Sequence, residues 1–163
     1  MVARFTSLAF MLVLLVAVIP AVSVEATAPA PVAFSPEEQT LASALLTERG
    51  NEGLQPLTID PTLTLLAEQR CAEMAAEHSF GHVTPDGKTV FDLLGAYGIT
   101  YHKLGETLAM NANTPDPGTE AARDLMNSPR HHAILFDTRY TAIGFGHSVD
   151  ADGIQYFAVI VLS

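Results

Sequence analysis

The stretch LGETLAM at residues 104–110 places a single acid, Glu106, among apolar and small residues. Such a run predicts a β-strand over residues 104–111, where an acid either faces solvent or is held inward by partners. Two histidines stand in short frames of small and turn-forming residues around this strand, His82 before it and His131 after it. Two imidazoles and a carboxylate suit metal binding or proton transfer, provided that the fold brings them together.

Helix-start signals surround the strand. Ser35, followed by Pro36 and Glu38, predicts a capping box and a helix that runs to about Arg49. The pair Asp60-Pro61 predicts a second helix that ends near Glu77 by the same logic of a cap followed by proline. Further helices are expected over residues 89–97, 119–127 and 130–136, and loops over 80–88 and 113–118.

The end of the chain alternates in hydrophobicity, first over residues 142–147 and then over 156–162, with Gly153 between the two runs. This pattern predicts a β-hairpin whose loop lies near residues 149–153. Helices, a strand, further helices and a hairpin together indicate an α+β fold in which helices pack on a small antiparallel sheet.

The N-terminus has the layout of a secretory signal peptide, with Arg4 ahead of an uninterrupted apolar run over residues 8–19. We expect a signal peptide over residues 1–26, a Pro/Ala linker over 27–34 and one compact domain over 35–163, secreted or extracytoplasmic. An uncleaved anchor is the alternative, because extending the run through Val24 approaches the roughly 20 apolar residues of a membrane span.

The chain of 163 residues carries a formal net charge of −10 and a single cysteine, Cys71. A strongly acidic surface disfavours nucleic acids and anionic membranes as partners. One cysteine excludes an internal disulfide, and its helical spacing from Ala67 and Met74 predicts a buried thiol. An intermolecular disulfide or a reactive thiol is the alternative, and the oligomeric state stays open.

His131 has the strongest local argument for a functional role. The helix start predicted at Ser128-Pro129 puts it in a first turn, where the helix dipole disfavours a charged imidazolium and lowers the expected pKa of the ring. A neutral ring is what a metal ligand requires. His132 points about 100° away around the same helix and is expected to be a surface or supporting residue.

Motifs for nucleophilic catalysis and nucleotide binding are absent: the sequence has no Gly-x-Ser-x-Gly, no His-Glu-x-x-His, no P-loop and no dinucleotide fingerprint. Ser128 is expected to act as a helix cap. Glu120 and Asp124, on the preceding helix, offer further carboxylates but are expected to be solvated. His78 is expected to lie in the last turn of its helix rather than pair with His82, because Gly81 ends the helix between them.

Several segments in register resemble the CAP superfamily of cysteine-rich secretory, antigen 5 and pathogenesis-related proteins, above all its bacterial secreted SCP-like branch. The resemblance covers about residues 41–162 and rests on 46–49 with 53–57, 63–74, 80–87, 98–101, 105–109, 127–131 and 143–146. It implies a three-layer α–β–α sandwich with a central groove. His82, Glu106 and His131 match the histidine, glutamate and histidine that line that groove.

The chain departs from the family pattern in three ways. Some members carry a second groove glutamate in the helix before the last histidine, but the corresponding residues 125–128 include no acid. Leu125 stands where that helix usually has a tryptophan, and the family disulfides are absent, as is common in the bacterial branch. A four-residue groove site is therefore not expected here.

The family resemblance leaves the function open, since members are implicated in binding lipids or divalent metals, in signalling, in defence and, in a few cases, in proteolysis. We expect a secreted binding module, non-enzymatic rather than catalytic, whose groove holds zinc or another divalent cation through His82 and His131. Glu106 would be a third ligand or the partner that orients a liganding histidine. No organic cofactor is expected. The alternatives are a metal-assisted peptidase or esterase with Glu106 as the catalytic base, and a carrier of an apolar ligand such as a lipid.

Overall fold

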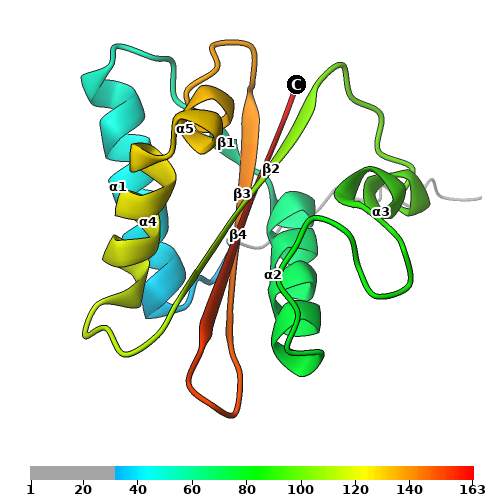
Figure 1. The fold of residues 1–163 in the computed structure, drawn as a ribbon. Coiled ribbons are helices and arrows are strands. Elements are labelled where there is room, and N and C mark those ends of the chain that lie inside the picture. Colours follow the sequence, from blue (N-terminus) through cyan, green and yellow to red (C-terminus); the bar gives the residue numbers. More distant parts are fainter. Residues whose placement is uncertain (1–31) are drawn as a thin grey trace, which may run out of the picture.

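The computed structural model describes residues 32–163, so the predicted signal peptide and most of the predicted linker lie outside the described residues. Five helices and four strands make up this part of the chain (Figure 1). In chain order they are α1 (Pro36–Asn51), β1 (Thr58–Ile59), α2 (Pro61–Ala76), α3 (Val90–Ala96), β2 (Leu104–Asn111), α4 (Pro117–Asn127), α5 (Pro129–Leu135), β3 (Ala142–Val149) and β4 (Gln155–Leu162).

The first two helices begin where the cap signals predicted. The Ser35 hydroxyl accepts a hydrogen bond from the backbone N–H of Glu38, and the Glu38 carboxylate accepts one from the N–H of Ser35, which confirms the capping box of α1. The Asp60 carboxylate accepts from the N–H groups of Thr62 and Leu63 at the start of α2. Each cap satisfies backbone donors that have no partner within the helix.

The expected loop over residues 113–118 was two residues too long. The helix α4 begins at Pro117, because the side chain of Asp116 caps it by accepting from the N–H of Thr119. The signal was the same cap followed by proline that starts α1 and α2. Ser128 does occupy the N-cap position of α5, but its side chain makes no capping hydrogen bond.

The four strands form one sheet in the order β1-β3-β4-β2. The predicted hairpin is confirmed: β3 and β4 pair antiparallel, and β4 also pairs antiparallel with β2, which sets Glu106 opposite Ile160. The sheet is not wholly antiparallel, since the two-residue strand β1 runs parallel to β3. Two residues are too few to show a strand periodicity, so the sequence analysis did not include β1.

Helices cover both faces of the sheet and give the α–β–α sandwich (Figure 1). One core cluster joins α1, α4 and α5 to inward side chains such as Phe145, Phe157 and Val159. A second joins α2 and α3 to the opposite face, with Leu104, Leu108 and others. Alternation along a strand sends successive side chains to opposite faces, so Glu106 lies on the α2 face between those two leucines.

The helix α2 packs unusually close to β3. A Cβ atom added at Gly144 would lie 2.2 Å from the carbonyl carbon of Leu63, and one added at Gly146 would lie 2.1 Å from that of Ala67. Only glycine permits this approach, which fixes α2 over the sheet and so places its buried side chains against β2. Within residues 32–163, no helix is long and apolar enough to cross a membrane.

Candidate functional site: a histidine–glutamate–histidine cavity

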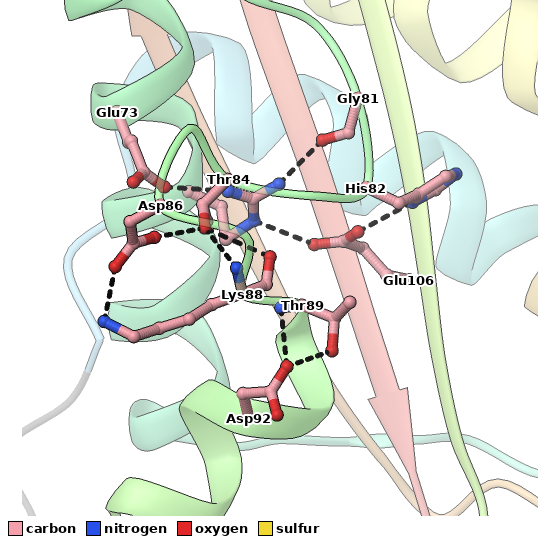
Figure 2. Close-up of polar contacts among 10 residues, drawn as sticks. Glu73, Gly81, His82, Thr84, Asp86, Lys88, Thr89, Asp92 and Glu106 are labelled. Atoms are coloured by element: carbon pink, nitrogen blue, oxygen red, sulfur yellow. Dashed lines mark hydrogen bonds and ion pairs between the residues drawn. The ribbon is translucent and has the colours of Figure 1, made fainter.

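Glu106 is a buried carboxylate in the middle of β2, with 7% of the residue exposed. Its Oε1 accepts a hydrogen bond from Nε of Arg70 at 3.2 Å, and its Oε2 lies 2.7 Å from Nδ1 of His82. Figure 2 shows His82 and Glu106 pointing toward each other, one from the loop after α2 and the other from β2. The acid is therefore held inward by partners, which was one of the two possibilities left open by the strand pattern.

Arg70 is the residue that the sequence analysis missed. It is 1% exposed, and besides Glu106 it contacts Glu73 at 2.8 Å and the carbonyl oxygen of Gly81 at 2.7 Å. It thereby ties α2 to β2 and to the following loop. A signal was present, since position 70 falls on the apolar stripe of α2 between Ala67 and Met74. A cation at a core position requires a buried acid or acceptor.

His82 is carried by a loop with its own internal hydrogen bonds. The N–H of Thr84 donates to the carbonyl of Lys88 at 2.7 Å, and the N–H of Lys88 donates to the Thr84 hydroxyl at 2.8 Å (Figure 2). A carboxylate only accepts, so Nδ1 of His82 carries the hydrogen toward Glu106. The other ring nitrogen, Nε2, points away from Glu106, on a side chain that is 45% exposed.

His131 reaches the same cavity from α5. The cavity has a volume of about 300 Å³ and is lined by His82, Thr89, Val90, Phe91, Leu104, Gly105, Glu106, Arg130, His131 and Ile134. Burial lowers the pKa of His131, and the nearby His82 and Arg130 lower it further. The predicted direction of the pKa shift is confirmed, but its causes are burial first and then neighbouring charge, and not the helix dipole. His131 is thus biased toward the neutral ring.

The three predicted residues therefore line one cavity. Their ligand atoms do not lie close enough together for all three to bind one metal ion as they stand. Among residues 32–163, a group of three ligand atoms lying within 4.8 Å of one another is formed by His78, Asp150 and Asp152, and not by the cavity trio. Both oxygens of Glu106 are occupied by Arg70 and His82. This arrangement suits an acid that orients a histidine better than one that binds a metal directly.

The group of His78, Asp150 and Asp152 lies at the far end of the sheet, where the hairpin turn meets the end of α2. His78 Nδ1 is 3.2 Å from Asp150 Oδ2, which also accepts from the Tyr156 hydroxyl at 3.1 Å. The other oxygen of Asp150 accepts from the N–H groups of Asp152 and Ile154. Asp150 is already saturated with donors, so a cation there would have to displace existing hydrogen bonds.

The remaining candidates take supporting places. His132 lies 2.9 Å from Glu52 and stacks on Phe136, away from the cavity, as its helical position predicted. Glu120 pairs with Arg123 on the surface of α4. The Cys71 thiol is fully buried, as predicted, and burial raises its pKa.

Comparisons with known proteins agree with this fold. Residues 44–162 match the Cysteine-rich secretory protein family (CAP). The chain is 32% identical over 121 residues to the uncharacterized protein YkwD of Bacillus subtilis, covering 74% of this chain and 46% of that protein, so it spans about half of that relative. The structure of an outer surface protein from Borrelia burgdorferi has a TM-score of 0.71 at 22% identity, covering 81% of this chain and 96% of that one.

A structure described as NaASP2 with Zn²⁺ has a TM-score of 0.55 at 11% identity, covering 78% of this chain and 80% of that one. At such identities the two structural likenesses concern the fold alone. The family match over most of the chain, the α–β–α sandwich and the bacterial relative lead to one conclusion: the chain belongs to the CAP superfamily, in its bacterial branch.

Proposed function

We propose that this protein is a secreted binding module whose cavity holds a divalent cation, zinc being the first to test, through His82 and His131. The observation that carries the proposal is the 2.7 Å contact between Nδ1 of His82 and Glu106. A histidine that donates one ring N–H to a carboxylate presents its other nitrogen as a fixed, more basic ligand. His131, with its lowered pKa, supplies a second neutral imidazole to the same cavity.

Glu106 has the role of orienting His82 in this proposal. Arg70 holds the carboxylate from the other side, so that a buried charge is paired rather than left alone. Two imidazoles leave coordination positions open for water or a ligand. A bound cation would supply Lewis acidity there, and the chain's own residues would fix the histidine tautomer and position. The zinc named with NaASP2 supports the choice of metal.

The hydrolase alternative has weaker support. A general base needs a free oxygen within hydrogen-bond reach of the attacking water, yet both oxygens of Glu106 are engaged. The second acid that some family members carry is missing here, since residues 125–128 at the end of α4 include no acid. We therefore favour binding over catalysis.

Calorimetric titration of zinc into residues 27–163 tests the proposal. We expect zinc to bind with a dissociation constant of about a micromolar or lower. We expect His131→Ala to lose that binding. His132→Ala is the matched control, because it removes the adjacent imidazole outside the cavity. Binding that is absent from the unaltered protein, or that survives in His131→Ala, contradicts the proposal.

Secretion is a separate part of the proposal, supported by the apolar run at residues 8–19 and by the outer-surface location named for the Borrelia burgdorferi protein. Expression of the full chain in a bacterial host, followed by mass determination of the released protein, tests it. We expect a mature N-terminus near residue 24 or 27. An intact N-terminus found only in the membrane fraction indicates an anchor instead.

A further inference from the structure

Arg130 stands out among the basic residues of this acidic protein. Within residues 32–163, five of the other Lys and Arg side chains form salt bridges: Arg70, Lys88, Lys103, Arg123 and Arg139. The sixth, Arg49, is buried against backbone carbonyls, including that of Leu135. In the same described part of the chain, Arg130 has neither a salt bridge nor a side-chain hydrogen bond, and it lines the cavity of His82 and His131.

The cavity is lined by a cation without a salt-bridge partner, in a molecule whose net charge is −10. Of its lining residues, Glu106 is the single acid, and its charge is shared between Arg70 and His82. Arg130 is therefore left uncompensated beside the cavity, and its field contributes to the lowered pKa of His131. An unpaired guanidinium beside two histidines attracts an anion from solvent.

The rest of the cavity lining is mostly apolar. Val90 and Phe91 come from α3, Leu104 from β2 and Ile134 from α5. Phe91 is 52% exposed, so it offers apolar surface to a molecule that enters the cavity. A volume of about 300 Å³ lies at the small end of ligand pockets, which span about 300–1,000 Å³. Such a space suits a small molecule with one apolar group.

We propose that the cavity binds a small apolar carboxylate and that Arg130 anchors its carboxylate group. The planar guanidinium matches a carboxylate with two parallel N–H donors, while the apolar walls take the hydrocarbon part. The carboxylate comes either from the C-terminal residue of a peptide or from a short fatty acid. This inference rests on the proposed function to the extent that both place ligands in the same cavity, but it does not require the metal.

The test is a titration followed by ¹⁵N–¹H NMR on metal-free protein in EDTA. N-acetyl-leucine and hexanoate represent the two sources of carboxylate, and N-acetyl-leucinamide is the neutral match of the first. We expect at least one of the two acids to bind and to change the chemical shifts of cavity residues. The amide should bind at least tenfold more weakly than its acid. Arg130→Gln should weaken acid binding at least tenfold. Whichever acid binds identifies the source.

Arg123→Gln is the control, since it removes the same charge from α4, where Arg123 pairs with Glu120. We expect it to leave acid binding unchanged. Binding of neither acid, equal binding of acid and amide, or unaltered binding by Arg130→Gln overturns the inference. Zinc calorimetry on the same protein variants, after EDTA has been removed, separates the two proposals, because a cavity that binds zinc but no carboxylate contradicts this inference alone.

Discussion

Replacing Arg70 by methionine tests the account of the site most severely. The guanidinium is 1% exposed and makes three polar contacts, to Glu106, to Glu73 and to the carbonyl of Gly81. Methionine keeps most of the volume and removes every donor. The contact with Glu73, whose side chain is 35% exposed, is worth about 0–1 kcal/mol in solvent. Taking the guanidinium away from the buried Glu106 costs far more, because it strands a charge.

Removing one partner of a buried ion pair costs about 3–5 kcal/mol, because the other charge stays buried without compensation. We expect Arg70→Met to lower the free energy of unfolding by that amount in urea titrations at neutral pH, followed by circular dichroism. Glu106→Gln added to Arg70→Met should recover part of the loss, since no charge is then stranded. The coupling energy between the two positions should reach about 1–3 kcal/mol.

The surface variant Arg123→Met is the control and should stay within about 0.5 kcal/mol of the unaltered protein. A loss below about 1 kcal/mol in Arg70→Met refutes the reasoning, because it shows that the buried contacts carry little free energy. Additivity of the two substitutions within about 0.5 kcal/mol refutes it as well, since interacting neighbours are not additive.

Other parts of the fold give three further predictions. In urea titrations, Gly146→Ala should destabilise the protein by more than the roughly 1–3 kcal/mol of ordinary overpacking, because the new Cβ would meet the backbone of α2. Gly50→Ala is the control: a Cβ there would have nothing within 4 Å, so this variant should be neutral or stabilising. Arg139 and Lys103 hold the pKa of Asp137 well below its usual range, so their stabilising effect is present above about pH 4 and is lost as the pH falls further. Asp137→Asn should therefore lower the melting temperature at pH 7, with a difference that shrinks toward pH 2; a constant difference would contradict this. Titration of His131 by NMR in metal-free protein should give a pKa below about 6.5, and Arg130→Gln should raise it only slightly because burial is the first cause; a value above 6.5 would contradict the assignment.

Local signals in the sequence were enough to locate most of the elements. The starts of α1 and α2 followed from Ser35 and Asp60, whose side chains satisfy the first N–H groups of each helix. The hairpin followed from alternation interrupted by Gly153, which adopts a positive φ of 82° in the turn. The start of α4 was misplaced although Asp116-Pro117 carried the same signal. Each of these features depends only on neighbours in sequence, which is why patterns could reveal them.

The site depended on contacts that no local pattern contains. Glu106 and His82 were candidates from their sequence frames, and the family resemblance implied that they share a groove. No sequence pattern predicted that Arg70 pairs with Glu106, because this ion pair forms only when α2 packs closely on the sheet. That approach depends on Gly144 and Gly146, two strand residues whose role becomes visible only once α2 is in place.

The central claim is that His82 and His131 bind a cation while Glu106 fixes the tautomer of His82. Long-range ¹⁵N–¹H NMR of the histidine rings, with one equivalent of zinc added to the metal-free protein, tests it most directly. We expect His82 to carry its hydrogen on Nδ1 before zinc is added, and the Nε2 resonance of His82 and one ring nitrogen of His131 to shift together on addition. Rings of His82 and His131 that do not respond, or a response at His78 in their place, would contradict the claim.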